Sequence, residues 1–321
     1  MKTPRQLPEH LSQRPFTLAE AKASGVSSRR LRHNSLRSFG RGIRAERTTA
    51  ELPLSVRARP FIQVNDRCAA SHWTAAALYG LPDFLKRGER GYHVIRPEGA
   101  AHLNRPHVVV HRAKLFDDEV TMKDGILVTT PARIWLDLAE FLNVDDLVAL
   151  GDACVRVPYP EIDGRADPHC TIAGLRRIID RHKGKRGIRK ARIAVEFIRI
   201  GADSPQETRL RLACLREGLP EPQLNVQLVA PDGGRGPKPD VAFVDFGVGV
   251  EYEGEHHGDQ DQIVRDITRS ERYADVNWLE VRISKRHMAD DAKAAVAKIR
   301  RALFARGWRP GRKTTAPQLS F

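Results

Sequence analysis

The sequence has little cysteine and no long apolar run, and both shortages narrow its class. The four cysteines are far apart and form no Cys-x-x-Cys pair of the kind that binds structural zinc or acts as a redox dithiol. We therefore expect reduced core residues at Cys68, Cys154, Cys170 and Cys214. No stretch approaches the roughly 18 apolar residues of a membrane span, and the polar N-terminus lacks the apolar segment of a signal peptide. These absences predict a cytoplasmic protein that does not span a membrane.

Positive charge is abundant and is concentrated in two places. The 321 residues carry a formal net charge of +14, which favours a polyanionic partner such as nucleic acid or an anionic membrane. Residues 1–50 contain 11 Lys and Arg against 3 acids, and residues 171–200 contain 10 against 2. The remaining residues are slightly acidic in sum. Two separate basic patches are typical of a protein that binds phosphate groups, so double-stranded DNA is the expected partner.

The first patch has the pattern of a winged helix-turn-helix. Thr17 and Glu20 form a capping box that opens a short helix, Gly25 breaks it, and Ser27 can cap a second helix over 28–34. Two short strands around a glycine-rich turn then follow as the wing. The expected DNA contacts are Arg29, Arg30 and Arg32 on the second helix with Arg41 and Arg44 on the wing. The alternative is a small basic helical hairpin that enters no groove.

Residues 51–156 change to a mixed α+β pattern, in which apolar runs at 92–95, 108–110 and 126–128 predict strands. Thr130-Pro131 opens a helix, since proline is favoured in the first turn. The histidines here are far from any acid cluster and are expected to be surface or core residues: His72, His107 and His111.

Residues 157–203 combine a Pro/Gly/Asp-rich linker with a basic helical segment. Lys183, Lys185 and Arg186 lie in a glycine-containing elbow between two helix-like stretches. This elbow is expected either to bind phosphate or to be a solvated run of charge.

Residues 204–308 carry the chemistry, in the predicted order α-β-β-β-α-β-α. Alternate residues of a strand share a face, so Glu251 and Glu253 should lie together while Val250 and Tyr252 pack inward. If strand 241–246 pairs with strand 248–253, Asp240 should lie near these acids. Converging carboxylates are the ligands that Mg²⁺ prefers, and a metal there would polarise a phosphodiester.

Pro239-Asp240, the Glu251-x-acid string and the upstream helix glutamate resemble the PD-(D/E)XK restriction-endonuclease-like superfamily, in particular the branch of very-short-patch repair endonucleases. The resemblance implies Mg²⁺ (or Mn²⁺) held by Glu207, Asp240 and Glu251, although Glu207 also completes a capping box with Ser204. Glu253 stands where the motif has lysine. The groups that could replace this lysine, or act as general base, are Lys238, His256 and His257. A helical ridge with Arg265 and Arg269 could track phosphates.

The N-terminal half resembles AbiEi-type antitoxin repressors. The strings that carry this resemblance begin at Arg14-Pro15-Phe16-Thr17 and Gly25-Val26-Ser27 and continue at Ser71-His72 and Thr130-Pro131-Ala-Arg133. The resemblance implies transcriptional autoregulation or opposition to a toxin protein.

The sequence thus predicts a multidomain α/β (α+β) protein with a winged helix-turn-helix (1–50), an α+β middle domain (51–156), a linker and basic helical segment (157–203), a restriction-endonuclease-like α/β domain (204–308) and a loose basic tail (309–321). The favoured hypothesis is a Mg²⁺-dependent DNA endonuclease positioned by its winged helix. The alternative is an AbiEi-like antitoxin or repressor whose nuclease domain is degenerate and whose partner is a cognate toxin. Fold alone does not decide between them, because function resides in the site.

Overall fold

A computed structural model describes residues 5–12, 14–39, 41–46, 52–63, 68–84, 91–100, 102–253 and 260–311, with backbone only for 260–267. His256, His257, the side chain of Arg265 and most of the predicted tail lie outside the described residues. The chain divides into two compact units. The first comprises Met1–Phe141 with Arg177–Ile188, and the second comprises Leu142–Arg176 with Arg189–Phe321. No helix in these described ranges is long and apolar enough to cross a membrane.

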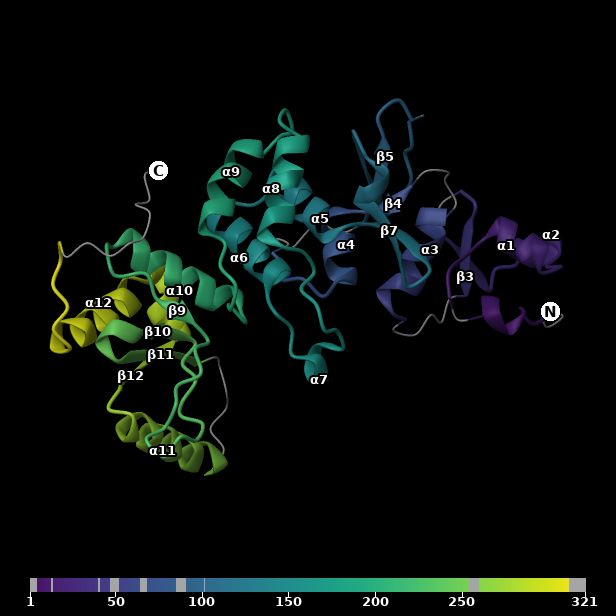
Figure 1. Cartoon of the computed structure of the whole chain (residues 1–321). Helices are drawn as coiled ribbons and strands as arrows, with labels where there is room; N and C mark the ends of the chain where they lie inside the picture. Colours follow the sequence, from purple (N-terminus) through teal and green to yellow (C-terminus); the bar gives the residue numbers. More distant parts are fainter. Residues whose placement is uncertain are drawn as a thin grey trace. The chain divides into compact units, whose positions relative to one another are not determined.

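The N-terminal elements of the first unit form a small winged fold (Figure 1). Thr17 and Glu20 form the predicted capping box, and the Ser27 hydroxyl accepts a hydrogen bond from Arg30 N at 3.3 Å, although the second helix is shorter than predicted. Leu11, Phe16 and Leu31 are among the buried residues of its core. The elements are β1 (Phe16–Thr17), α1 (Leu18–Ala23), α2 (Ser28–Leu31), β2 (Leu36–Ser38) and β3 (Ile43–Glu46), with antiparallel strand order β1-β3-β2.

The middle of the first unit is a five-stranded mixed sheet of order β6-β5-β4-β8-β7. The three predicted strands are confirmed, and the helix that begins at Pro131 ends at Leu138. Its strands are β4 (Ala69–Ala70), β5 (Tyr92–Pro97), β6 (Val108–Ala113), β7 (Val120–Lys123) and β8 (Ile126–Thr129), and its helices are α3 (Leu54–Gln63), α4 (His72–Leu78) and α5 (Pro131–Leu138).

The second unit has helices that lead into a four-stranded sheet of order β12-β11-β10-β9. Strands β10 and β11 are antiparallel, whereas β11 and β12 are parallel. The helices are α6 (Val144–Val155), α7 (Pro160–Asp163), α9 (Ile188–Phe197), α10 (Pro205–Arg216), α11 (Gln260–Asp275) and α12 (Ala289–Ala305). The strands are β9 (Gln223–Leu224), β10 (Val241–Phe243), β11 (Val248–Glu253) and β12 (Leu279–Ser284), and α8 (Ile172–Arg181) spans both units. The predicted order α-β-β-β-α-β-α is confirmed over residues 204–308.

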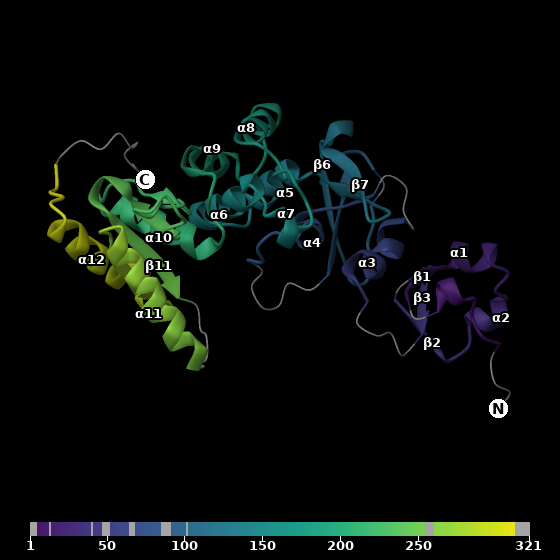
Figure 2. The same ribbon diagram turned by 60° about the horizontal axis from the view of Figure 1, so that its bottom comes forward.

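The two faces of this sheet have different coverings. Val248 and Val250 point into a core shared with α10 and α12, and Tyr252 packs against the same core. Gly249 faces the other way, where a Cβ atom would lie 2.5 Å from the Tyr273 ring of α11. Figure 2 shows α11 running along β11 on this second side. Glu251 and Glu253 share the Gly249 face by the two-residue period of a strand, as the sequence predicted.

Candidate metal centre and nucleic-acid interface

The hairpin of β10 and β11 brings Asp240 to Glu251. Val241 pairs with Val250, so the residue before β10 lies opposite the second half of β11. The carboxylate of Asp240 accepts a hydrogen bond from Tyr252 N at 2.7 Å, and Glu251 Oε1 accepts one from the Tyr273 hydroxyl at 2.6 Å. The predicted proximity of the two acids is therefore confirmed at the level of backbone register.

Glu207 joins them from the first turn of α10. Its backbone N–H donates to Ser204 Oγ at 3.3 Å, which confirms the cap. The side chain does not close the predicted capping box with Ser204, because its Oε2 accepts hydrogen bonds from Asp203 N at 2.9 Å and from Asn225 Nδ2 at 2.8 Å. The residue is only 5% exposed. Glu207 is thus a buried carboxylate held in place by hydrogen bonds.

The acids repel one another and are partly desolvated. Burial, with a smaller contribution from the charge of Asp240, raises the pKa of Glu207 to about 7 despite its hydrogen bonds. Burial also raises the pKa of Glu251 to about 7, again with a contribution from Asp240. Burial and the charge of Asp203 raise the pKa of Asp240 itself. We call Asp203, Glu207, Asp240 and Glu251 the acidic cluster.

Asp203 was missed by the sequence analysis. It lies directly before Ser204, so it reads as an ordinary acid ahead of a helix start. In the structure its Oδ2 accepts from the Tyr159 hydroxyl at 2.7 Å and lies 3.8 Å from Lys238 Nζ. Lys238 also donates to the Tyr159 hydroxyl. The Lys238 charge also acts to lower the pKa of Asp240, so Lys238 borders the acidic cluster and contacts it through Asp203.

Arginines surround the position where the nuclease motif has lysine. Glu253 Oε1 lies 3.8 Å from Arg269 NH1 and 3.5 Å from Arg282 NH1. The Arg269 charge also lowers the pKa of Asp240 and of Glu251. Arg269 therefore brings a positive charge from α11 to the edge of the acidic cluster. The sequence had predicted only a phosphate contact for this arginine.

The carboxylate donor set suits Mg²⁺ chemically, but its present arrangement is not a coordination group. Among the residues that the structure describes, no three His, Cys, Asp or Glu side chains are grouped so that they could hold a metal ion. One oxygen of Glu207 and one of Asp240 already accept hydrogen bonds from neighbouring N–H groups. The Mg²⁺ (or Mn²⁺) site therefore stays a prediction.

The winged fold presents some of its arginines to solvent. Arg29 of α2, Arg32 at the C-terminal cap of α2 and Arg41 of the wing are exposed. Arg30 is different, because its guanidinium donates to Arg5 O at 2.7 Å and to Ser35 Oγ at 2.9 Å and lies 3.7 Å from Glu46. These contacts favour a packing role for Arg30 over the predicted DNA contact.

Two more basic residues lie on the wing strands. Arg44 NH1 donates to Ser38 Oγ at 3.0 Å across β2 and β3. Arg37 of β2 is exposed, with its guanidinium 5.2 Å from the centre of the Phe39 ring, and it was not among the predicted contacts. The second helix, its C-terminal cap and the wing thus carry five basic residues, Arg29, Arg32, Arg37, Arg41 and Arg44.

The basic elbow at 182–187 is packed onto the first unit. Lys185 Nζ lies 2.7 Å from Asp137 Oδ1, and Arg186 NH1 lies 3.3 Å from Glu140 Oε1. Gly187 has a φ of +80°, and a Cβ atom there would lie 2.4 Å from the carbonyl carbon of Ala139. Asp137 is fully buried, so Lys185 neutralises an internal charge. For Lys185 this pair favours a structural role over the predicted phosphate contact, whereas Lys183 and Arg186 are exposed and stay candidates for that contact.

The histidines of the middle domain are packed against one another. The rings of His72 and His111 stack with centroids 3.5 Å apart, and His93 Nδ1 lies 3.0 Å from His111 Nε2. Burial lowers the pKa of His93 and of His111 to about 4. The core interpretation is confirmed for His72, while His107 is a surface residue.

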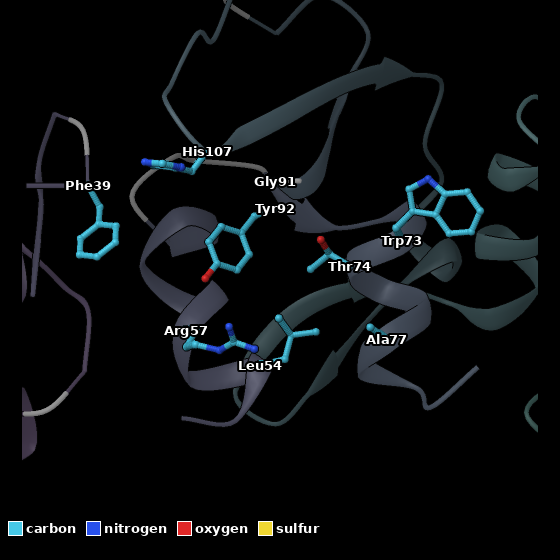
Figure 3. A pocket seen from close by; sticks show the side chains of 9 residues that line it. All are labelled: Phe39, Leu54, Arg57, Trp73, Thr74, Ala77, Gly91, Tyr92 and His107. Atoms are coloured by element: carbon cyan, nitrogen blue, oxygen red, sulfur yellow. The ribbon is translucent and has the colours of Figure 1, made fainter. Parts of the chain in front are cut away.

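A pocket of about 400 Å³ opens in the first unit (Figure 3). The close-up shows Phe39 of the wing at one side, the Tyr92 hydroxyl turned toward Arg57, and the Trp73 ring directed away from them. Tyr92 stacks on Phe61 with centroids 4.5 Å apart. The lining residues are Phe39, Leu54, Arg57, Trp73, Thr74, Ala77, Gly91, Tyr92 and His107.

One protein-family model matches the middle of the chain. A family model for the AbiEi antitoxin C-terminal domain matches residues 68–154, which run from just before β4 almost to the end of α6. The match supports the AbiEi resemblance in that part. It does not extend to 204–308, so the resemblance to restriction endonucleases keeps the status of a prediction.

Related chains are known from Mycobacterium tuberculosis. The uncharacterized proteins Rv2248 of strain H37Rv and MT2308 of strain CDC 1551 are each 28% identical over 211 residues, which cover 65% of this chain and 72% of theirs. The crystal structure of the Rv2827c protein from Mycobacterium tuberculosis overlaps 57% of this chain and 70% of its own, with 16% identity and a TM-score of 0.38. What the comparisons establish is therefore an AbiEi antitoxin-like segment at 68–154.

Proposed function

We propose that this chain is a DNA-binding regulator of the AbiEi antitoxin type. The observation that carries the proposal is the match of residues 68–154 to the AbiEi antitoxin C-terminal domain, directly downstream of a winged helix-turn-helix. The winged fold would bind double-stranded DNA, and a cognate toxin protein would be the second partner. Repression of its own promoter is the expected output of this arrangement.

Exposed arginines of the winged fold support DNA binding. Arg29 is exposed on α2 and Arg32 is exposed at its C-terminal cap. The second helix of a helix-turn-helix is the element that enters a major groove. Arg41 lies at the tip of the wing. Arginines at such positions contact phosphates and base edges, and each phosphate contact makes binding more sensitive to salt.

The test measures binding of the full chain to duplex DNA from its own upstream region. Fluorescence anisotropy gives the affinity at each concentration of a salt series. Replacing Arg29 and Arg32 with glutamate should weaken binding and lower the slope of log K against log salt by about 1 for each lost phosphate contact. The matched control is Arg301→Glu, which makes the same charge change at an exposed position of α12. Equal loss in the control, or no loss in the double variant, would overturn the assignment.

A second candidate, a metal-dependent DNA endonuclease, is favoured by one observation. In the acidic cluster burial raises the pKa of Glu207, Asp240 and Glu251, and the charge of Asp240 raises that of both glutamates. Carboxylates that are destabilised in this way are candidates for binding a cation. We expect Mg²⁺ or Mn²⁺ to be required for this activity.

Plasmid nicking with Mg²⁺ or Mn²⁺ tests this candidate. Asp240→Asn should abolish nicking, and Asp245→Asn, at an exposed position beyond β10, should leave it unchanged. If neither the wild type nor Asp240→Asn nicks the plasmid while both bind it equally, the enzyme candidate fails and the regulator stands alone.

A further inference from the structure

Two cysteines that are far apart in the sequence meet in the second unit. Cys154 is in the last turn of α6, and Cys170 lies two residues before α8. The backbone N–H of Cys170 donates to the carbonyl oxygen of Cys154 at 3.0 Å, which holds the two residues side by side. The hydrogen bond between their thiol groups and the burial of Cys154 keep the pKa of Cys154 well above its ordinary range. The backbone hydrogen bond therefore makes Cys154 and Cys170 neighbours in space.

The two thiols differ in access to solvent. Cys154 is fully buried, whereas Cys170 is partly exposed, and both are free. A small oxidant can therefore reach the sulfur of Cys170, whereas the sulfur of Cys154 is shielded from solvent. Reactive cysteines of redox-sensitive proteins show this combination of an accessible thiol and a neighbouring resolving thiol. Cys68 and Cys214 are buried elsewhere, the first in the other unit and the second in α10.

We propose that Cys154 and Cys170 form an intramolecular disulfide when a peroxide oxidises the chain. The Cys170 sulfur attacks one oxygen of hydrogen peroxide, the O–O bond breaks, and one water leaves as Cys170 becomes a sulfenic acid. The Cys154 sulfur then attacks the Cys170 sulfur, the S–O bond breaks, and the hydroxyl leaves as a second water with the Cys154 proton. Two thiols and one peroxide give one disulfide and two waters, and two electrons pass from sulfur to oxygen.

The disulfide would close residues 155–169 into a loop that borders the acidic cluster. Within that loop Tyr159 donates to Asp203 Oδ2 at 2.7 Å, and Arg156 NH1 lies 3.5 Å from Asp203 Oδ1. Lys238 donates to the same Tyr159 hydroxyl. A bond between the two ends of the loop restricts the unfolded chain, so oxidation should raise the midpoint of thermal unfolding of the second unit.

Thiol counting by intact-mass spectrometry tests the disulfide. The full chain is reduced, desalted, treated with hydrogen peroxide, and then alkylated with N-ethylmaleimide in denaturant so that the buried cysteines also react. The reduced chain should take up four labels, one for each cysteine, and the oxidised chain two. Trypsin cuts at Arg156 and Arg165, so the oxidised sample should also contain a Cys154–Cys170 peptide pair that separates on reduction. Four labels after peroxide, or a pair that joins two chains, would refute the proposal.

Variants separate the role of Cys170, which peroxide oxidises, from the role of Cys154, which then forms the disulfide. With Cys68 and Cys214 both changed to serine, peroxide should lower the labels from two to none. Cys154→Ser should trap Cys170 as a sulfenic acid that reacts with dimedone, whereas Cys170→Ser should leave Cys154 fully alkylatable in a chain whose circular dichroism is unchanged. Loss of the Cys154 thiol in the Cys170→Ser chain would show that peroxide does not enter through Cys170 and would overturn the assignment.

Discussion

Replacing Glu207 with glutamine separates the two roles of this residue. Glutamine keeps a carbonyl oxygen that can accept the hydrogen bonds now donated by Asp203 N and Asn225 Nδ2, at 2.9 and 2.8 Å. It removes only the charge. If Glu207 were nothing more than a helix cap, the substitution would be neutral or mildly destabilising at every pH. If Glu207 belongs to a strained acidic cluster, the substitution should stabilise the second unit, and only where the wild-type carboxyl is ionised.

The size of the effect follows from the raised pKa. Burial raises the pKa of Glu207 from its ordinary 4.5 to about 7. At about 1.36 kcal/mol for each tenfold change in the ionisation constant, the ionised group costs the folded state at most about 3.4 kcal/mol. Below pH 4.5 the carboxyl is protonated whether the chain is folded or not, so the penalty is absent. As the pH rises to about 7 the unfolded chain loses its proton first, and stability falls. The advantage of Glu207→Gln should therefore grow over this window and level off above it.

Hydrogen exchange across a urea series is the suitable assay, because peptides from α10 and β11 report this unit separately from the first. We expect Glu207→Gln to gain about 1 to 3 kcal/mol at pH 8 and close to nothing at pH 4. Glu161→Gln, at an exposed position of α7, is the matched control and should show no gain. If the second candidate function holds, Mg²⁺ should narrow the difference at pH 8 by stabilising the wild type. A loss of stability in Glu207→Gln that is equal at both pH values would refute the reasoning and leave Glu207 as a cap.

Three further predictions concern the scaffold. Asp152→Ala should lower the free energy of unfolding of the second unit by about 3 kcal/mol in urea titrations, because its fully buried partner Arg211, 2.9 Å away, would keep only the more distant Glu221, at 4.0 Å, as a counter-charge. Gly187→Ala should destabilise the first unit, since the new Cβ would lie 2.4 Å from backbone, whereas Gly184→Ala has open space and should not. The rings of His93 and His111 should stay neutral down to about pH 4 in an NMR titration, and stability should fall as the pH drops from 6.5 toward that value, because the unfolded histidines take up protons first.

Short-range patterns explain which parts of the fold could be predicted. The capping box at Thr17, the helix start at Pro131 and the alternation of Glu251 with Tyr252 each depend on residues one to four positions apart. Such patterns act through local hydrogen bonds and through the period of the backbone, so they persist whatever the chain packs against. The length of the second helix was overestimated because nothing local marks where packing ends it.

Long-range contacts explain what could not be predicted. In the sequence Lys185 is one cation in a basic run, yet in the structure it pairs with Asp137 of α5. Asp203 reads as an acid before a helix, yet it joins the acidic cluster and raises the pKa of Asp240. Arg269 approaches Glu253 only because α11 packs on that face of the sheet.

The sequence by itself determined the winged helix, the strand order along the chain and the identity of the acids on β11. Tertiary structure decided which charges are free to bind a partner and which neutralise one another. The physical reason is that a charge in water is nearly independent of its neighbours, whereas burial couples it strongly to each charge within a few ångströms. Sequence lists the charges of this protein, and only packing sets their distances.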